Sequence, residues 1–300
     1  MINYIKYPNN YFLNSKIIIN SYVFGYIQNL VNEVPFLKYL YLTHAVGYFK
    51  KTIIKNQLID MKINKRNIIV TSPYEYNFYK KHLNYSDNYM YKAGLPRYDR
   101  FNSIKKKNME KQCILISFTY RSYSNQIYKK SLFKKNLEKL LKNKLLIGLL
   151  QQKNINLIYI PHHYDVVRNR VLNQKKFPDI IYSRQDRLGH YIEQCSLFIT
   201  DFSSISIDFM FLNKPSLFYL IDVKDKINFE EREYMQYDYR HYFGNVFYNQ
   251  ESLIKRIKYY IDRGFRIDNE LKNNYESLFY YKNNITEKII DIINEIIKKK

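Results

Sequence analysis

The sequence has little glycine and proline, almost no cysteine and no tryptophan. Its 300 residues include 7 Gly, 7 Pro and 2 Cys. So little glycine and proline argues against a loop-rich or all-β scaffold. The two cysteines, Cys113 and Cys195, stand in apolar surroundings without a metal-type spacing to histidine. We therefore expect two buried free thiols, as is typical of a reducing compartment.

The chain also lacks a long apolar run. No stretch approaches the roughly 20 consecutive apolar residues that a membrane-spanning helix needs. The first ten residues contain no apolar core of the kind found in a signal peptide. We therefore expect a soluble or peripheral protein.

Positive charge and tyrosine are abundant. Lys and Arg number 49 against 27 Asp and Glu, which gives a formal net charge of +22, and there are 33 Tyr. Such a charge attracts anions, including nucleotides, phosphate polymers and anionic membrane surfaces. The tyrosines are spread over the whole chain, so they do not indicate a nucleic-acid surface. No residue spacing predicts a metal site, and no glycine-rich phosphate loop occurs.

Short apolar runs alternate with longer helical patterns, which predicts an α/β fold with parallel sheets. The predicted strands cover 16–19, 39–42, 67–71, 89–93, 113–118, 157–160, 179–182, 197–199 and 216–220. The predicted helices cover 22–32, 47–58, 131–150, 203–212, 251–263 and 278–300, and one more begins at Ser72-Pro73. A polar, basic stretch without periodicity at about 103–111 predicts a linker between two domains, 1–102 and 112–300.

The segment from Leu197 to Phe209 carries the clearest chemistry. Its apolar strand ends in Thr200-Asp201-Phe202-Ser203-Ser204, and an apolar helical pattern follows at once. The free N–H groups of a helix start bind phosphate, and the two serine hydroxyls add donors. Ligands of α/β folds bind at the carboxyl ends of parallel strands. The alternative is that Asp201 or Ser203 only caps the helix, and the residues alone leave both open.

Together with four other segments, this one resembles the CDP-glycerol glycerophosphotransferase family, which includes teichoic-acid polymerases. After Thr200–Ser204 the family-like order continues with a helix and Leu212-Asn213-Lys214-Pro215. The other similar segments are Leu42-Thr43-His44-Ala45-Val46-Gly47, Gly94-Leu95-Pro96-Arg97-Tyr98-Asp99, Ile116-Ser117-Phe118-Thr119-Tyr120-Arg121 and Ile160-Pro161-His162-His163. They differ from the family pattern at Ala45, Ile160 and His163, where the family has Gly, Lys and Pro.

The resemblance implies two Rossmann-like lobes in a GT-B arrangement, with a shortened N-terminal acceptor lobe and a C-terminal lobe that binds the CDP donor. The last helix would pack back on the N-terminal lobe. The implied reaction transfers glycerol phosphate, or a related polyol phosphate, from the CDP-activated donor to a hydroxyl of an envelope polymer or its lipid-linked primer, and releases CMP. It implies no cofactor, and it places the enzyme peripherally at the cytoplasmic face of the membrane.

The resemblance also implies roles for individual residues. His44 would be the general base on the acceptor hydroxyl, and a histidine pKa near 6.5 suits that task. His162 would contact the diphosphate and stabilise or protonate the leaving group. The implied donor-binding residues are Arg97, Arg121, Thr200, Asp201, Ser203 and Ser204. For each histidine and arginine, a structural role or an ion pair is the simpler alternative from the residues alone.

Two other functions remain open at the level of sequence. A nucleotide-sugar glycosyltransferase of capsule or envelope polysaccharide synthesis would share the GT-B fold, because a fold does not fix a function. A non-catalytic basic binding protein would share the charge. The nucleotide product distinguishes them: CMP, a nucleoside diphosphate, or none.

Overall fold

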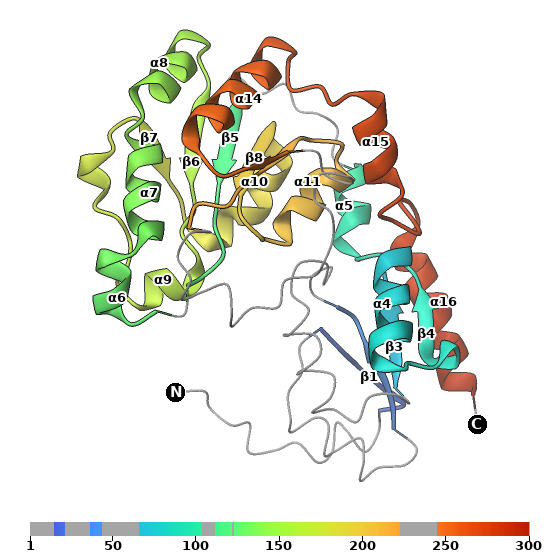
Figure 1. Cartoon of the computed structure of the whole chain (residues 1–300). Helices are drawn as coiled ribbons and strands as arrows, with labels where there is room; N and C mark the ends of the chain where they lie inside the picture. Colours follow the sequence, from blue (N-terminus) through green and yellow to red (C-terminus); the bar gives the residue numbers. More distant parts are fainter. Residues whose placement is uncertain are drawn as a thin grey trace. The chain divides into compact units, whose positions relative to one another are not determined.

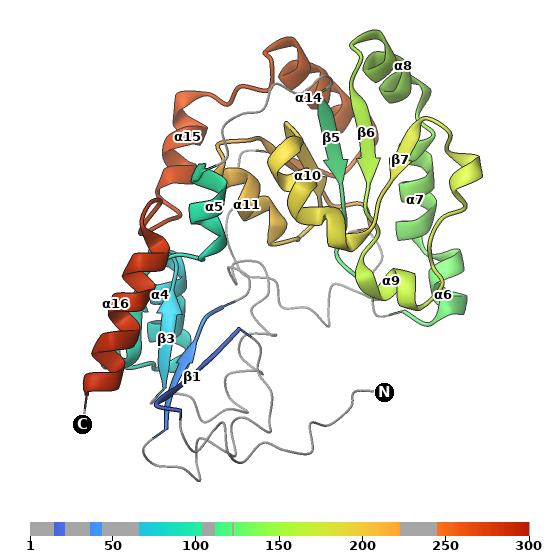
Figure 2. The ribbon, with the colours of Figure 1, turned by 180° about the vertical axis from the view of Figure 1, so that it is seen from behind.

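The computed structural model describes residues 15–21, 37–43, 66–103, 112–121, 123–222 and 245–299. The chain divides into two compact units (Figures 1 and 2). Unit 1 comprises Met1–Val46, Ile53–Asp99 and Phe279–Lys300, and unit 2 comprises Gly47–Thr52 and Arg100–Leu278. The predicted linker at 103–111 lies almost entirely outside the described residues.

Unit 1 is built on a parallel sheet with the strand order β1-β2-β3-β4. Its strands are β1 (Ile17–Asn20), β2 (Lys38–Tyr41), β3 (Asn67–Val70) and β4 (Met90–Lys92). Helix α4 (Pro73–Leu83) contacts β3, and a short 3₁₀ turn, Asp87–Tyr89, precedes β4. Ser72 caps α4 through the Glu75 N–H and proline occupies the first turn, so the predicted helix start is confirmed. The predicted helices at 22–32 and 47–58 lie outside the described residues.

The C-terminal segment completes unit 1. Helix α16 (Ile285–Lys298) contacts β2, and its apolar stripe of Ile285, Ile289, Ile292 and Ile296 is buried. The carboxylate of Asp99 accepts hydrogen bonds from the N–H groups of Ile285 and Thr286, 3.0 and 2.6 Å away. Asp99 thus supplies the cap that the helix lacks locally, since Asn284 makes no side-chain capping bond.

The sequence predicts one helix over 278–300, but the structure begins it at Ile285. Tyr280 donates its N–H to the Thr71 carbonyl, and Asn284 adopts a left-handed φ of 54°. The chain before Ile285 is therefore not part of the helix. The packing of this last helix on the first unit agrees with the sequence-based expectation. As a result, residues 279–300 cluster with unit 1 rather than with the rest of 112–300.

Unit 2 contains a six-stranded parallel sheet with the order β10-β9-β8-β5-β6-β7. The strands are β5 (Cys113–Ile116), β6 (Asn156–Tyr159), β7 (Ile180–Tyr182), β8 (Leu197–Thr200), β9 (Ser216–Tyr219) and β10 (Val246–Phe247). The chain runs from β5 outward through β6 to β7, then returns to β8 on the other side of β5. The parallel α/β class predicted from the sequence is confirmed for the described residues.

Helices cover both faces of this sheet (Figures 1 and 2). The helices from Arg97 to Glu276 are α5 (Arg97–Ser103, which begins in unit 1), α6 (Asn125–Lys130), α7 (Leu132–Leu141), α8 (Lys144–Gln152), α9 (His163–Val167), α10 (Leu188–Gln194), α11 (Ile205–Phe211), α14 (Gln250–Asp262) and α15 (Asn269–Glu276), with 3₁₀ turns at Gln174–Lys176 and Gln185–Arg187. The single helix predicted over 131–150 is wrong. Helix α7 ends at Leu141, and Asn143 caps α8 by accepting the N–H groups of Leu145 and Leu146.

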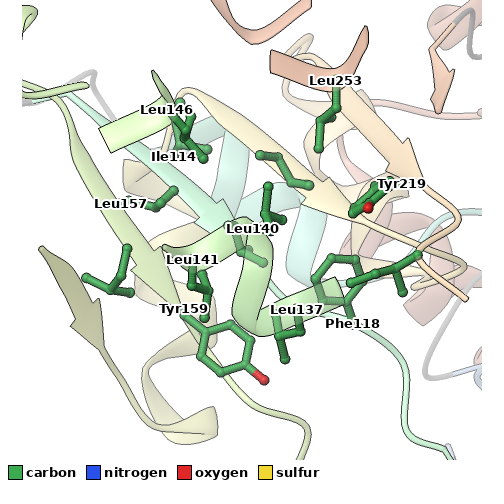
Figure 3. Close-up of a cluster of buried hydrophobic side chains, with 14 of the residues drawn as sticks. Ile114, Phe118, Leu137, Leu140, Leu141, Leu146, Leu157, Tyr159, Tyr219 and Leu253 are labelled. Carbon is green, nitrogen blue, oxygen red and sulfur yellow. The ribbon is translucent and has the colours of Figure 1, made fainter. Parts of the chain in front are cut away.

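The core of unit 2 lies mainly between the sheet and helices α7, α8 and α14. Figure 3 shows Leu137, Leu140 and Leu141 of α7 against strand residues such as Ile114 and Tyr159. On the other face, α10 contacts β5 and α11 contacts β8 and β9, and the rings of Phe198 and Phe209 stack 4.9 Å apart. Because all strands of this sheet run parallel, the polar residues that end or follow them gather at its carboxyl edge.

Candidate functional site

The carboxyl edge of the unit 2 sheet contains the switch point of the fold. Connections leave β5 toward β6 and leave β8 toward β9, so the loops after β5 and β8 diverge from neighbouring strands. A crevice at this position is where open α/β sheets bind ligands. Four of the sequence-predicted site residues follow these two strands, Thr200 is the last residue of β8, and His162 follows β6.

Asp201 ties the two diverging loops together. Its carboxylate accepts the N–H of Thr119 at 2.9 Å and the Thr119 hydroxyl at 2.8 Å, and also accepts the N–H of Phe202. The side chain is fully buried. Burial would raise the pKa of Asp201, but the Arg121 guanidinium and the donated N–H groups hold that pKa below its ordinary value. Asp201 is therefore a buried, ionised brace rather than the cap of α11.

Arg121 is the counterion of this brace. Its Nη1 lies 2.7 Å from Asp201 and also donates to the carbonyl and hydroxyl of Thr119. Its Nε and Nη2 form a bidentate pair with Asp222, which follows β9, at 2.7 Å each. The guanidinium is 2% exposed and packs over the Phe133 ring. Arg121 thus joins the loops after β5, β8 and β9 from beneath the surface.

A second buried arginine extends the brace to the loop after β6. Arg170 donates to the carbonyls of Arg121 and Tyr123 and to the side chain of Asn125. Its Nη1 lies 3.9 Å from the carboxylate of Asp165, within α9. Burial raises the pKa of the Asp165 carboxyl to about 6, against the opposing effect of Arg170. The four loops at this edge are consequently held by two buried arginines.

His162 caps α9 with its ring. Nδ1 accepts the N–H of Tyr164 at 3.2 Å, so a neutral ring carries its proton on Nε2. The ring stacks on Tyr164 at 5.8 Å with an interplanar angle of 12° and lies 5.7 Å from Tyr120, which is in the loop after β5. The ring orientation is therefore fixed from two loops, and Nε2 is the nitrogen able to donate a hydrogen bond to an anion.

Ser203 and Ser204 immediately precede α11, which begins at Ile205 and not at Ser203 as the sequence predicts. Ser204 occupies the cap position, and neither its side chain nor that of Ser203 is fully buried. The Ser203 hydroxyl accepts the Ile205 N–H at 3.3 Å. Ser204 makes no side-chain capping bond, so its hydroxyl is not used to start the helix. A helix start with two accessible hydroxyls suits a phosphate group.

The other predicted site residues differ in setting. Thr200 ends β8 fully buried, and its hydroxyl makes no hydrogen bond to any part of the chain that is described. Arg97 begins α5 half-buried, over the ring of Tyr98, and belongs to unit 1. His44 lies outside the described residues, just beyond the buried Thr43. Within the described ranges, no three His, Cys, Asp or Glu side chains gather to hold a metal ion.

Sequence reasoning misses three members of the brace. Asp222, Arg170 and Asp165 belong to no recognisable motif. Arg121 is 101 residues from Asp222 and 49 residues from Arg170, and Asp165 joins the brace only through Arg170. Only the juxtaposition of strand ends in a parallel sheet could have suggested them, and Asp222 does follow a predicted strand.

Comparison with known proteins agrees with this fold and these motifs. Residues 2–295 match the family model "CDP-Glycerol:Poly(glycerophosphate) glycerophosphotransferase". A similar protein is the minor teichoic acid biosynthesis protein GgaB of Bacillus subtilis, 24% identical over 91% of this chain and 31% of that protein. The teichoic acid glycerol-phosphate primase of the same organism is 27% identical over 82% of this chain and 65% of that protein.

A solved structure of the wall teichoic acid polymerase TagF has a similar fold. It superposes with a TM-score of 0.64 at 16% identity, over 89% of this chain and 70% of that chain. The α/β fold, the five ordered motifs and a match over nearly the whole length place the chain in one protein family. The chain belongs to the CDP-glycerol:poly(glycerophosphate) glycerophosphotransferase family. It spans about a third and about two thirds of the lengths of the two Bacillus relatives.

Proposed function

We propose that this protein transfers glycerol phosphate, or a related polyol phosphate, from a CDP-activated donor to a hydroxyl of a teichoic-acid-like envelope polymer or its lipid-linked primer. The acceptor oxygen attacks the phosphorus that bears the polyol. The bond from that phosphorus to the bridging oxygen breaks, and CMP leaves. Family membership supports the reaction, and one TagF variant was studied after a soak with CDPG.

The observation that carries the proposal is the braced switch point of unit 2. A diphosphate needs several donors at once, and a rigid site supplies them without reorganisation. Ser203 and Ser204 offer hydroxyls just before α11, and His162 offers Nε2 from the loop after β6 at the same edge of the sheet. The two loops that carry them are held to the β5 loop by Asp201, Arg121 and Arg170.

We assign the six unit 2 residues to two kinds of role. Ser203, Ser204 and His162 contact the donor diphosphate. Arg121 and Asp201 act as positioning residues, because their polar atoms are turned to each other, to Thr119 and to Asp222. Thr200 supports the end of β8 from a buried position.

His162 is better suited to donate a hydrogen bond than to deliver a proton. Protonating Nδ1 would give that nitrogen a hydrogen and remove the acceptor of the Tyr164 N–H, so the cap of α9 favours the neutral ring. A neutral Nε2–H stabilises the charge that develops on the departing phosphate oxygen. The proton of the acceptor hydroxyl goes to His44 in this proposal, which makes His44 the general base.

The remaining parts of the proposal concern the molecule as a whole. Two Rossmann-like lobes in a GT-B arrangement would bring Arg97 and His44 to the acceptor side of the donor. The net charge of +22 favours a peripheral position at an anionic membrane surface, on the cytoplasmic face where a CDP-activated donor is available. No helix among the described residues is both long and apolar enough to cross a bilayer.

Replacing Ser203 and Ser204 with aspartate tests the donor site. The two carboxylates would remove both hydroxyl donors and repel the diphosphate, so affinity for CDP-glycerol should fall by at least about 100-fold. Isothermal titration of the S203D/S204D protein with CDP-glycerol measures it. Ser277→Asp, at an exposed position after α15, adds charge to the same unit and should leave affinity unchanged. Unchanged affinity in the folded double variant would remove these serines from the site.

A further inference from the structure

Six exposed apolar side chains of unit 2 come from two stretches, one from α6 into the start of α7 and one from α9 to Val171. They account for nearly half of the exposed large hydrophobic residues in the described part of the chain, although they come from two short stretches. They are Ile127, Leu132, Tyr164, Val166, Val167 and Val171, and Val167 is the most exposed at 63%. We call the surface that they form, with the cations beside them, the α6–α9 surface.

The two stretches form one continuous structure. The side chain of Asn125 in α6 donates to the Arg168 carbonyl at 3.3 Å, and Arg170 donates back to Asn125 at 2.8 Å. The Tyr128 hydroxyl also donates to the Arg170 carbonyl. In both Figure 1 and Figure 2, α6 and α9 lie side by side at one end of unit 2, and α8 lies at the other end. Side-chain hydrogen bonds therefore hold the two stretches that carry the apolar side chains together.

Every exposed charge in these two stretches is positive. Residues 125–135 contain no Asp or Glu, and residues 163–171 contain only Asp165, which is buried beside Arg170. The exposed cations are Lys129, Lys130, Lys135 and Arg168. Tyr164, Val167 and Arg168 stand three and four positions apart, so they share one side of the α9 turn, with Asp165 directed inward.

This combination of aliphatic side chains and cations decides what the surface fits. A polyanion in water would be attracted by the lysines, but it offers no apolar phase in which Val166, Val167 and Ile127 could be buried. An anionic bilayer offers both, because its headgroups attract Lys and Arg and the acyl boundary accepts Val, Ile, Leu and Tyr. We propose that the α6–α9 surface is the part of the described chain that docks on an anionic lipid bilayer.

Docking through this surface would place the enzyme near a lipid-linked acceptor, so this role of the surface rests on the proposed function. Helix α9 begins at His162, so the surface adjoins the edge of the sheet that carries the candidate donor site. An enzyme whose acceptor is attached to lipid needs its site close to the bilayer. The binding itself does not depend on catalysis and can be measured separately.

The test is co-sedimentation of the full chain with vesicles of phosphatidylcholine alone or with 30% phosphatidylglycerol. Removing two lysines with K129Q/K130Q should weaken binding to the anionic vesicles on the order of 30-fold, from about 1 kcal/mol per cation. Removing apolar contact with V166S/V167S should weaken it on the order of tenfold, including at high salt. None of these four residues belongs to the donor site.

Matched controls come from the opposite end of the same unit. Leu145→Ser removes the most exposed aliphatic side chain of the described chain, at 76%, and K144Q/K153Q removes two exposed lysines from α8 and its end. Both controls should bind vesicles nearly as the unaltered protein does. Equal binding by K129Q/K130Q, V166S/V167S and the controls, with unchanged melting temperatures, overturns the proposal. So does equal binding to neutral and anionic vesicles.

Two further measurements separate the other outcomes. If K129Q/K130Q and V166S/V167S, the patch variants, bind vesicles normally but lose affinity for soluble polyglycerol phosphate, the α6–α9 surface contacts polymer and the membrane proposal is wrong. CMP release with a water-soluble acceptor reports the proposed function independently, and the patch variants should retain it. Loss of vesicle binding with normal CMP release supports the docking surface. Absence of CMP release from every variant and from the unaltered protein rejects the proposed function alone.

Discussion

At the scale of single residues, Asp201 and Arg121 form a buried ion pair that joins the loops of the proposed donor site. Both are essentially inaccessible, and the ion pair between them measures 2.7 Å. Two buried charges are costly to desolvate, so the arrangement is tolerated because hydrogen bonds from Thr119 and the bidentate contact with Asp222 satisfy the remaining polar atoms. Such a pair specifies one geometry of the loops, which a diphosphate site requires.

The Asp201→Asn substitution tests this structural role. Asp222 still pairs with the guanidinium in this variant, so the expected loss is that of hydrogen bonds to a charged group, about 1.5–3 kcal/mol. Chemical denaturation at pH 7 should show the loss. Because the pKa of Asp201 is lowered by folding, its stabilisation is present above the unfolded pKa and is lost as the pH falls through the lower folded pKa. The difference between variant and parent should therefore shrink in strong acid.

An exposed ion pair supplies the control for Asp201. Lys258 and Asp262 of α14 lie 2.5 Å apart but are 60% and 44% exposed. Solvent screens such a pair, so Asp262→Asn should leave the denaturation midpoint unchanged. If Asp201→Asn behaves like this control, the carboxylate is not the brace that the geometry indicates.

At the scale of elements, the segment Gly94–Asp99 acts as a dock for α16. A Cβ atom on Gly94 would lie 2.8 Å from Cδ1 of Ile285, so glycine lets the helix approach closely. Tyr98 packs edge-on against Phe279 at 5.7 Å, and Asp99 caps the helix start. Three positions of one predicted motif thus hold the C-terminal helix in unit 1, whereas Arg97 between them remains the candidate for ligand contact.

Asp99→Ala should loosen the start of α16. Loss of a carboxylate cap costs about 1 kcal/mol, and the N–H groups of Ile285 and Thr286 would lose their acceptors. Hydrogen exchange should accelerate at the first turn of α16, and the unfolding free energy should fall by that amount. Asp291→Ala, on an exposed position of the same helix, should change neither. Equal exchange in the two variants would argue against the cap.

The sequence predicts every described strand except the two-residue edge strand β10, and it predicts the helix ends less well, for a physical reason. Strands such as Leu197–Thr200 are short apolar runs bounded by polar residues, a local signal. The break at Asn143 is hidden because leucines continue on both sides of it, and the start of α16 depends on Asp99, 186 residues away. The same limit applies to the site: Ser203 and Ser204 follow from a local pattern, but the burial of Arg121 depends on Asp201 and Asp222.

Local chemistry also predicts the state of the two cysteines. Cys113 begins β5 and Cys195 follows α10, and both are buried as free thiols, as expected. Their sulfurs lie 2.8 Å apart, which the sequence does not indicate, because the contact depends on the pairing of β5 with β8. Pairing between strands is a non-local property, and it decides which predicted elements become neighbours.

At the scale of the whole molecule, the proposed mechanism separates donor binding from acceptor activation. The proposed donor contacts, Ser203, Ser204 and His162, belong to unit 2. The proposed base, His44, belongs to unit 1. A variant of one group should therefore change one kinetic parameter and spare the other, provided that the two act at different steps.

His44→Ala tests that separation. Loss of a general base typically lowers the rate by about 10²–10⁴-fold, so kcat for CMP release should fall by this factor. The dissociation constant for CDP-glycerol in isothermal titration should stay unchanged, because the donor contacts are untouched. The S203D/S204D protein should show the opposite pattern, with weakened donor binding as its primary defect. His190→Ala, on an exposed position of α10, is the histidine control and should keep normal turnover. If His44→Ala retains near-parental kcat, or loses donor affinity instead, His44 does not activate the acceptor and the division of labour proposed for the chain is wrong.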